Sequence, residues 1–385
     1  MAATEKGVWD LQDVRDKQLQ SEWDYTSSSG FLWSWGKGDD WGNLGHNTRQ
    51  TVSSPVQVGS DGTWVELGID GRVYGSNFGI KTDGTMWAWG LNTVGQLGLN
   101  SPTNAARSSP TQIPGSTWSK LSHAYLRASA VKTDGTLWLW GYNNKGQLGH
   151  NNITDYSSPV QVPGSTWKSI TSGTTFSLAT KTDGTFWAWG YNNYGMLGNN
   201  NLTYYSSPVQ VPGSTWSYAW AAEESVLGVR TDGTLWAWGR NTNGSLGQNN
   251  TTWRSSPTQI PGTYADGQDK INGGYYGALA IKTDGTLWSW GYNGAGNLGN
   301  NNKTNYSSPI QIGTETTWNG VQSGYIYTAA SKTDGTLWSW GLNSNGQLGH
   351  NNTTQYSSPI QIPGSWATGS GALGVGWDGM MAIKN

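Results

Sequence analysis

The sequence predicts an all-β fold, a seven-bladed β-propeller closed by strands from both chain ends. Three observations predict it: a repeat of fixed period, four short strand-like runs in each repeat, and complementary part-copies at the two ends. The phrase Trp-x-Trp-Gly recurs at intervals of 49 to 54 residues, and a period of this size is typical of solenoids, arrays and propellers. Its last residue is in turn Gly36, Gly90, Gly141, Gly190, Gly239, Gly291 and Gly341.

The repeat at residues 167–212 shows how each blade is expected to form. Asp183-Gly184 predicts a tight hairpin with a type I′ turn, because both residues tolerate positive φ. Pro208 has no amide hydrogen to donate and is expected at a strand start or an outer sheet edge. Four short antiparallel strands, repeated seven times, are typical of a propeller. The predicted strands span residues 167–171, 176–180, 185–189 and 207–211.

The two chain ends complement each other. The first copy starts at its third strand, residues 31–35, and the last copy stops after its second strand, residues 381–385. One composite blade, from about residues 30–60 and 365–385, would close the ring and leave no open sheet edge. The propeller domain is therefore expected to span residues 30–385.

Composition excludes several classes of protein. The 385 residues carry a formal net charge of −2 without a Lys/Arg run, which argues against a nucleic-acid partner. No apolar run approaches the roughly 20 residues that cross a bilayer, and no secretory signal is expected, so we expect no membrane insertion. The absence of Cys excludes disulfides, thiolate metal sites and Cys nucleophiles.

The 26 Trp residues predict a core built from indoles. In each Trp-x-Trp the two indoles share one face of a strand, and the residue between them is mostly small. Neighbouring blades can therefore interdigitate. The alternative is a ring of sugar-stacking Trp, as in propeller lectins. The predicted core pairs are Trp33, Trp35, Trp87, Trp89, Trp138, Trp140, Trp187, Trp189, Trp236, Trp238, Trp288, Trp290, Trp338 and Trp340.

The segment from Trp138 to Gly149 resembles the core phrase of the regulator-of-chromosome-condensation repeat, and the resemblance covers about residues 30–385. It implies a seven-bladed propeller, a fold that serves exchange factors, ligase subunits and a secreted β-lactamase inhibitor. The family often places a His before the second strand, where this chain reads Thr175-Phe176-Ser177. The basic N-terminal tail of the chromatin-bound members is absent. These departures argue against nucleotide exchange on a small GTPase.

No catalytic, cofactor or metal site is expected. His46, His150 and His350 follow Gly-x-Leu-Gly in different copies, so a ring would spread them apart rather than bring them to one ion. Glu223 and Glu224 are adjacent on a strand and should point to opposite faces, which argues against paired acid/base work. No Gly-x-Ser-x-Gly elbow is present.

Binding is expected where the repeats differ. The residue before Ser-Ser-Pro varies, and Tyr and Arg are enriched at binding hot spots. A second variable stretch precedes each hairpin; the alternative for both is an ordinary polar rim. The predicted partner-binding residues are Arg107, Tyr156, Tyr205, Trp253, Arg254, Tyr306 and Tyr356. The second stretch contributes Asp70, Arg72, Tyr74, His123, Tyr125, Arg127, Glu223, Glu224, Tyr275, Tyr276, Tyr325 and Tyr327.

Residues 1–29 do not fit the repeat and are predicted to form an arm with a short amphipathic helix. The arm either packs on its own propeller or docks into another subunit. Residues 7–19 resemble the opening of virion structural proteins from phages of aquatic bacteria. The predicted anchoring residues are Val8, Trp9, Leu11, Val14, Leu19 and Trp23.

These features together predict a non-enzymatic phage virion structural protein, located in the virion as a tail, fibre or capsid-associated component. The arm would bind other virion proteins, and the propeller rim would bind a host surface protein or glycan. Two alternatives remain open: a lectin-like propeller that binds glycans, and a bacterial protein-protein interaction scaffold or inhibitor.

Overall fold

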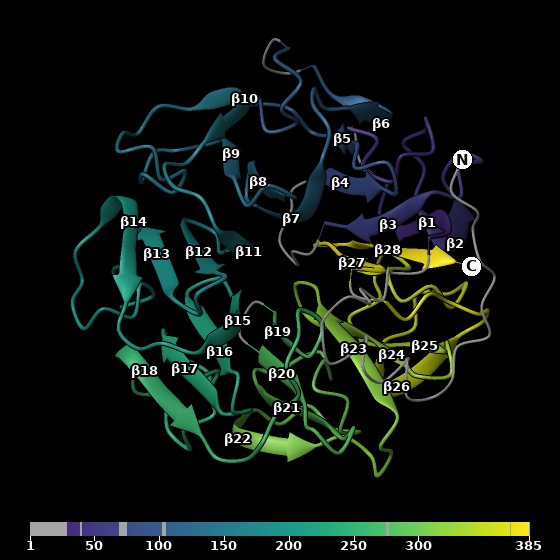
Figure 1. Ribbon diagram of the computed structural model, residues 1–385. Coiled ribbons are helices and arrows are strands. Elements are labelled where there is room, and N and C mark those ends of the chain that lie inside the picture. Colours follow the sequence, from purple (N-terminus) through teal and green to yellow (C-terminus); the bar gives the residue numbers. More distant parts are fainter. Residues whose placement is uncertain are drawn as a thin grey trace, which may run out of the picture.

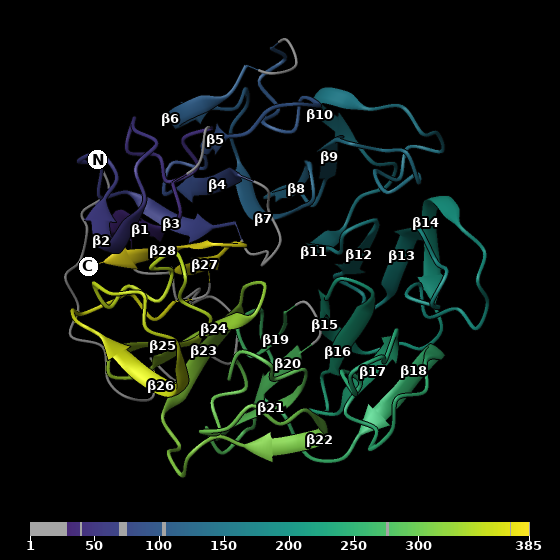
Figure 2. The same cartoon turned by 180° about the vertical axis from the view of Figure 1, so that it is seen from behind.

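The computed structural model describes residues 29–38, 41–68, 75–101, 105–274, 277–369 and 371–384. These residues form seven four-stranded sheets arranged as a ring around a central axis (Figure 1). Every strand pair within a sheet is antiparallel, and the same ring is seen from behind in Figure 2. The prediction of a seven-bladed propeller is confirmed.

Each blade runs from an innermost strand at the axis to an outermost strand at the rim. Blade 1 consists of β3 (Trp64–Leu67), β4 (Ser76–Lys81), β5 (Met86–Gly90) and β6 (Arg107–Gln112). Blade 2 consists of β7 (Trp118–Ala124), β8 (Arg127–Lys132), β9 (Leu137–Gly141) and β10 (Tyr156–Gln161). Blade 3 consists of β11 (Trp167–Ser172), β12 (Phe176–Lys181), β13 (Phe186–Gly190) and β14 (Tyr205–Val211). Blade 4 consists of β15 (Trp216–Ala221), β16 (Ser225–Arg230), β17 (Leu235–Gly239) and β18 (Arg254–Ile260).

The remaining blades follow the same plan. Blade 5 consists of β19 (Ile271–Gly273), β20 (Gly277–Ile281), β21 (Leu287–Gly291) and β22 (Tyr306–Gln311). Blade 6 consists of β23 (Trp318–Ser323), β24 (Tyr327–Lys332), β25 (Leu337–Gly341) and β26 (Tyr356–Ile362). Blade 7 consists of β27 (Leu373–Val375), β28 (Gly379–Lys384), β1 (Phe31–Gly36) and β2 (Val52–Gln57).

Blade 7 closes the ring, because two of its strands come from each end of the chain. Strand β1 pairs with β28 in a continuous antiparallel register from Phe31 opposite Lys384 to Gly36 opposite Gly379. The purple and yellow strands therefore lie side by side in Figure 1. The predicted closure by strands from both termini is confirmed, and the ring has no unpaired edge at its seam.

The hairpin between the second and third strands differs in type from the prediction. Gly184 has φ of +77°, but Asp183 is not among the residues with positive φ, so the turn is not type I′. The reason is local: the Asp183 carboxylate accepts the Thr185 amide at 2.9 Å and the Thr185 hydroxyl at 2.7 Å. This side-chain turn holds Asp183 in an ordinary conformation and leaves only Gly184 left-handed.

The long loops between third and fourth strands are ordered by buried Asn side chains. Asn143 accepts the Leu148 amide at 2.9 Å and donates to the Thr154 carbonyl at 2.9 Å, which ties the two ends of its loop together. Leu148 is fully buried beneath the loop. Asn192, Asn241, Asn293 and Asn343 accept the matching leucine amide in blades 3 to 6. The Asn-rich composition of these loops therefore has a structural cause.

The second Trp of each pair links its blade to the preceding one. Its side chain is fully buried, and its indole nitrogen donates to a backbone carbonyl in the preceding blade's loop, as from Trp189 to Gln147 at 2.9 Å. The glycine that ends Gly-x-Leu-Gly lies against this indole: a Cβ on Gly149 would approach Trp189 Nε1 to 2.8 Å. The full set is Trp35, Trp89, Trp140, Trp189, Trp238, Trp290 and Trp340.

The first Trp of each pair is only partly buried, unlike its neighbour two residues on. In blades 1 to 4 and 6 it packs edge-on against the Trp that begins the innermost strand, as Trp187 does against Trp167 at 6.3 Å between ring centroids. Lys181 places its ammonium 4.7 Å from the Trp167 ring and 4.6 Å from the Trp187 ring. The set is Trp33, Trp87, Trp138, Trp187, Trp236, Trp288 and Trp338.

Candidate functional site

The topology gives the ring two different faces. The turns between first and second strands and the loops between third and fourth strands lie at one end of the blades, here called the loop face. The hairpins between second and third strands and the connections between blades lie at the other end, here called the turn face. A binding site is expected on the face whose side chains differ from blade to blade.

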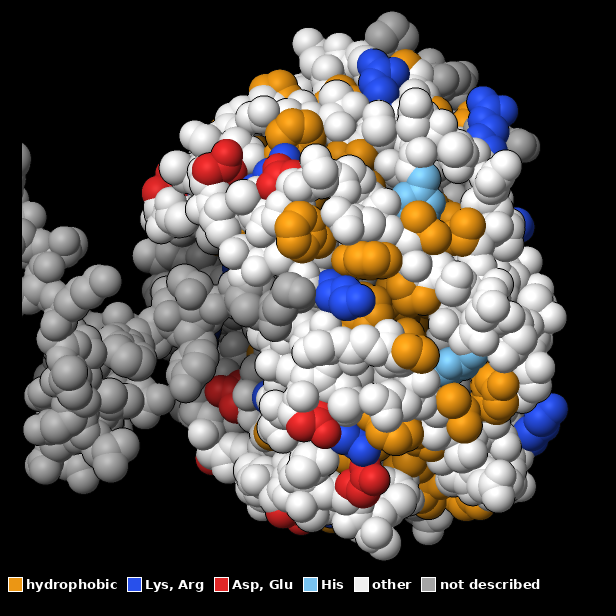
Figure 3. Space-filling view, turned by 90° about the vertical axis from the view of Figure 1, so that its right-hand side faces the viewer, with side chains coloured by type: hydrophobic (Ala, Val, Ile, Leu, Met, Phe, Trp, Pro, Cys, Tyr) orange, Lys and Arg blue, Asp and Glu red, His pale blue; other side chains and the backbone are white. Residues whose placement is uncertain are grey.

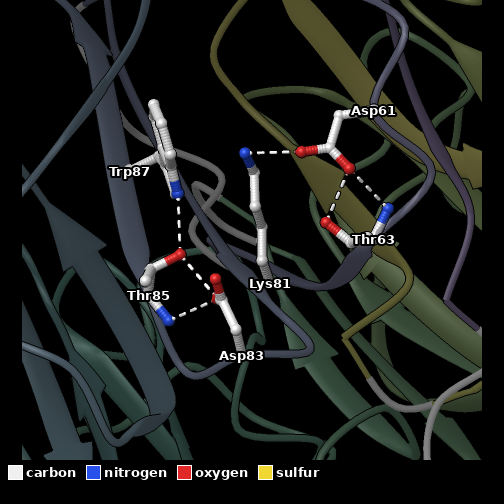
Figure 4. A network of polar contacts seen from close by, with 6 residues as sticks. All are labelled: Asp61, Thr63, Lys81, Asp83, Thr85 and Trp87. Carbon is white, nitrogen blue, oxygen red and sulfur yellow. Dashed lines mark hydrogen bonds and ion pairs between the residues drawn. The ribbon is translucent and has the colours of Figure 1, made fainter.

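The turn face carries the same polar network in blade after blade, shown for blade 1 in Figure 4. Asp83 accepts the Thr85 amide and hydroxyl at 2.9 and 2.7 Å, and Trp87 donates to the same hydroxyl at 2.9 Å. Lys81 lies 3.7 Å from the centroid of the Trp87 ring and pairs with Asp61 at 2.7 Å. The Thr85 hydroxyl and amide lower the pKa of Asp83, so the carboxylate stays charged.

The cation of this network recurs around the whole ring. One Lys or Arg per blade lies over the ring of the first Trp of the pair, and such contacts stabilise by about 0.5–1 kcal/mol each at partly exposed sites. Because the contact is repeated in every blade, we assign it to the stability of the repeat and not to the binding of a partner. The cations are Lys81, Lys132, Lys181, Arg230, Lys282, Lys332 and Lys384.

Shallow crevices between blades reach the outer rim. One of about 330 Å³ lies between blades 6 and 7, lined by Trp33, Pro55, His350, Trp366 and Lys384 among others. Figure 3, which views the side of the ring that holds the seam, shows hydrophobic side chains beside Lys/Arg and His along this rim. A crevice between blades 5 and 6 has the matching lining, so these crevices belong to the repeat.

The loop face exposes large apolar side chains on three adjacent blades that the other blades do not repeat. Four of the seven large hydrophobic side chains that are exposed in the described residues lie on the loops of blades 2, 3 and 4. They are Ile153 (67% exposed), Leu202 (54%), Tyr204 (42%) and Trp253 (51%), here called the tip patch. The equivalent loops of blades 5 and 6 carry Lys303, Asn305, Thr353 and Gln355 instead.

The aromatic side chains of the tip patch are held by their neighbours. Tyr204 packs on Tyr191 with ring centroids 4.8 Å apart, and Asn193 hydrogen-bonds both hydroxyl groups. Trp253 of blade 4 meets Tyr194 of blade 3 edge-on at 4.8 Å, so the patch continues across the blade boundary. Because these rings are already ordered, little conformational entropy remains to be lost when a partner binds.

Two cations lie against the aromatic rings that neighbour the patch. The Arg240 guanidinium lies 4.9 Å from the Tyr194 ring centroid and forms an ion pair with Glu224. The Lys145 ammonium lies 5.9 Å from the Tyr191 ring. The two cations thus contact Tyr191 and Tyr194, the rings on which Tyr204 and Trp253 pack. Tyr, Trp and Arg are the residue types enriched at binding hot spots.

A second cluster lies on the loop face at the seam. Trp377 stacks on Tyr325 with ring centroids 3.9 Å apart and an angle of 14° between the planes. Beside it is a cavity of about 150 Å³, lined by Lys37, Asn77, Trp377 and Asp378 among others. Lys37 lies 3.9 Å from the Asp378 carboxylate, and burial raises the pKa of Asp378 above its ordinary value.

The column before Ser-Ser-Pro begins the outermost strands and is half-buried. Its tyrosine hydroxyls accept hydrogen bonds from loop asparagines, as Tyr156 does from Asn152 at 3.0 Å. Arg107 and Arg254 donate to carbonyls of their own loops. Binding through this column stays a prediction, and Trp253 is its best exposed neighbour. The half-buried members are Arg107, Tyr156, Tyr205, Arg254, Tyr306 and Tyr356.

In the stretch before each hairpin, some side chains are buried and bind the next blade, and others are partly exposed. Arg127 is buried and donates to the carbonyls of Gly173, Thr174 and Phe176 in blade 3. The hydroxyl of Tyr327 bridges in the same way to two carbonyls of blade 7. His123 is buried as well. Residues Tyr125, Glu223, Glu224 and Tyr325 are partly exposed, whereas Asp70, Arg72, Tyr74, Tyr275 and Tyr276 lie outside the described residues.

The three histidines after Gly-x-Leu-Gly bind backbone and hydroxyl groups of their own blades. His150 Nε2 lies 3.1 Å from the Val160 carbonyl, and His350 Nε2 lies 3.0 Å from the Ser339 hydroxyl. Within the described ranges, no group of three or more His, Cys, Asp or Glu side chains is placed to hold a metal ion. No helix in the same ranges is both long and apolar enough to cross a membrane.

The sequence analysis missed most of the tip patch. Ile153, Leu202 and Tyr204 were not singled out, nor were Tyr191, Tyr194 and Arg240, which support the patch. The signal was present: a comparison of the five loops that follow Asn-Asn shows apolar residues in blades 2 to 4 and polar ones in blades 5 and 6. Of the four patch residues, only Trp253 was predicted to bind a partner.

The class of protein is a closed repeat propeller, with a turn face that repeats from blade to blade and a loop face that varies. The family model described as "Regulator of chromosome condensation (RCC1) repeat" matches residues 83–124, 134–180, 183–219, 232–281, 284–331 and 334–370. The chain therefore belongs to the RCC1 repeat family. The resemblance identified from Trp138 to Gly149 is thereby confirmed.

The chain is similar over about a third of its length to several eukaryotic proteins. Protein RCC2 of Homo sapiens is 33% identical over 130 residues, which cover 33% of this chain and 24% of RCC2. The ultraviolet-B receptor UVR8 of Arabidopsis thaliana is 29% identical over 133 residues, which cover 33% of this chain and 29% of UVR8. The matched segment thus spans about a quarter of the length of these relatives.

Solved structures share the whole ring. Prp20p from Saccharomyces cerevisiae superposes with a TM-score of 0.81 at 19% identity, covering 94% of this chain and 93% of that protein. Human WBSCR16 superposes with a TM-score of 0.79 at 20% identity, covering 92% and 99%. At these identities the likeness shows the fold alone.

The predicted phage virion function is wrong. The relatives include RCC2, the E3 ubiquitin-protein ligase HERC2 and UVR8, and these similarities do not indicate a virion protein. The error came from residues 7–19, a segment too short to outweigh a repeat that fills the rest of the chain. Residues 1–28, including the predicted anchors Val8 to Trp23, lie outside the described residues.

Proposed function

We propose that this chain is a non-enzymatic interaction propeller that binds a protein partner through its loop face. The tip patch carries the proposal: three adjacent blades expose large apolar side chains on their loops, and the two aromatic ones are packed on neighbouring rings, while the opposite face repeats one network. Exposed apolar side chains that are concentrated on one part of a surface, with aromatic rings among them, are typical of protein interaction sites.

The composition of the loops supports a folded protein as the partner. Tyr and Trp supply large, stiff contact area, and the surrounding Asn, Ser and Gly supply adaptable hydrogen bonds, as in antibody paratopes. The relatives support an interaction role as well, because a ubiquitin ligase and a light receptor share the repeat without sharing a reaction. Prp20p, which shares the fold, has binding properties toward Gsp1p and histones.

The test begins with a partner captured by crosslinking of the tagged full chain in its own cells, followed by measured affinities of variants. The Leu202→Ser, Trp253→Ser double variant should weaken binding at least roughly 20-fold, because hot-spot aromatics contribute about 2 kcal/mol or more. The matched control is Lys303→Ser, Gln355→Ser, which changes the equivalent positions of blades 5 and 6 and should leave affinity unchanged.

Two outcomes would contradict the proposal. Full affinity in the double variant would show that the tip patch does not bind the partner. Faster nucleotide release from a GTPase partner in the presence of catalytic amounts of the chain would show that the propeller is an exchange factor rather than a passive binding module.

A further inference from the structure

A groove on the turn face lies where the chain enters the propeller. It has a volume of about 800 Å³ and lies between blades 1 and 2. Val65 and Ile80 of blade 1 and Trp118 of blade 2 give it an apolar lining, and Thr117 and Thr133 form part of its rim. Ser29, the first described residue of the chain, also lines it.

The backbone fixes the direction from which the preceding residues arrive. Gly30 and Trp64 exchange two backbone hydrogen bonds, at 3.1 and 3.3 Å, which hold the start of the chain antiparallel to β3. Residue 29 is therefore tied to the groove rather than free to leave it at any angle. Trp23 lies six residues earlier, so its Cα is within about 20 Å of Ser29 even in a fully extended chain.

Residues 1–28 carry apolar and acidic side chains, which suit the apolar lining of the groove and the cation beside it. Val8, Leu11, Leu19 and Trp23 are apolar at near-helical spacing. Residues 1–28 also carry six acidic and three basic side chains. Lys132, whose ammonium lies 4.6 Å from the Trp118 ring beside the groove, has no carboxylate within ion-pair distance in the described part of the chain.

We propose that residues 1–28 fold back onto their own propeller, with the apolar side chains of this arm in the groove between blades 1 and 2 and its carboxylates toward Lys132. The arm would cover apolar surface on the turn face and add a contact between two adjacent blades. It would leave the loop face open, so this inference is independent of the proposed function.

The absence of Cys from the chain allows a direct test by disulfide trapping. Thr133→Cys is combined in the full chain with Leu11→Cys, Leu19→Cys or Trp23→Cys in turn. A disulfide requires Cα atoms within about 7 Å of each other, so at least one pair should oxidise within a monomer. The matched control is Thr333→Cys, the equivalent exposed turn residue of blade 6, which should stay reduced with all three arm positions.

Three results would overturn the proposal: no intramolecular disulfide with Thr133→Cys, equal trapping with Thr333→Cys, or disulfide-linked dimers alone. The last would place the arm on a second copy of the chain. The readout is a disulfide and not partner binding. A negative trapping result therefore leaves the proposed loop-face function intact, and a failure of the binding test leaves the arm proposal intact.

Hydrogen exchange provides a second measurement that needs no new thiol. Trp118 donates its amide to Gly84 at 3.0 Å beside the groove, and Trp318 donates to Gly285 at 3.2 Å in the equivalent place of blades 5 and 6. In the Leu11→Ser, Leu19→Ser, Trp23→Ser variant, exchange at Trp118 should accelerate roughly tenfold, with Trp318 unchanged. The Gln12→Ser, Gln18→Ser, Gln20→Ser control should match the wild type; equal rates in all three proteins would contradict the docking.

Discussion

His123 is an imidazole buried at the contact between blades 1 and 2. Its ring lies 5.1 Å from Phe78, and neither ring nitrogen has a hydrogen-bond partner among the described residues. Gly68 lies so close that a Cβ there would approach the imidazole to 2.4 Å. Burial lowers the pKa of His123 to about 3, so the ring is neutral in the folded protein at neutral pH.

We expect His123→Leu to stabilise the protein and to flatten its acid sensitivity. The pKa of His123 is about 3 in the folded protein and 6.5 in the unfolded chain. As the pH falls from about 6.5 to about 3, the unfolded chain takes up a proton that the folded protein does not, so the free energy of unfolding decreases. Between neutral pH and about pH 4, wild type should lose roughly 3 kcal/mol of unfolding free energy more than the variant. Urea denaturation at both pH values measures this difference, and parallel losses in the two proteins would contradict it.

At the scale of the element, the two indoles of a Trp-x-Trp strand have different roles. The sequence places both on one face, and the structure shows that only the second is fully buried and bonded to the preceding blade. The first lies under a lysine and donates to the hairpin threonine, as Trp187 does to Thr185 at 2.9 Å. The fully buried indoles have no free face to stack on a sugar, which removes the lectin-like alternative for the second position.

This difference predicts unequal costs of substitution within one strand. Trp189→Phe should lower the free energy of unfolding by roughly 2–3 kcal/mol, because it leaves a cavity and removes one of the two hydrogen bonds that the Gln147 carbonyl accepts, the other coming from the Ser177 hydroxyl. Trp187→Phe removes an indole whose nitrogen binds an accessible hydroxyl, and it should cost about 1 kcal/mol. The two urea midpoints decide: equal shifts would show that both indoles are equivalent core residues.

At the scale of the whole molecule, stability depends on closure of the ring by blade 7. Strands β1 and β28 come from opposite ends of the chain, and every register pair between them is continuous. Leu32 is fully buried on β1, whereas the adjacent Phe31 is 40% exposed. Closure removes the two sheet edges that an open ring would present, and open edges promote aggregation.

Leu32→Asp should therefore open the seam. An unpaired carboxylate buried in blade 7 is expected to cost more than about 3 kcal/mol and to lower the melting temperature with aggregation. Phe31→Asp, one residue earlier on the exposed side of the same strand, is the matched control and should change the melting temperature little. Similar melting curves for the two variants would indicate that the seam does not limit stability.

How far the site could be predicted also depends on scale. The repeat shows which positions vary, and Trp253 was found in this way. It does not show which variable side chains turn inward: Arg127 and Tyr327 bind carbonyls of the next blade, and His123 is buried. Trp253 packs on Tyr194 of the preceding blade because two loops meet at a blade boundary, which no single repeat encodes.

The sequence by itself determined the number of blades, the order of strands and the closure of the ring. These follow from local periodicity and from the two incomplete copies, which only a circle can join. The tertiary structure decided the hairpin type, the different burial of the two Trp residues in each pair and the exposure of large apolar side chains on three adjacent blades. Such features depend on which side chains of different repeats come into contact. The curvature of the ring sets these contacts, and the spacing of residues along the chain does not.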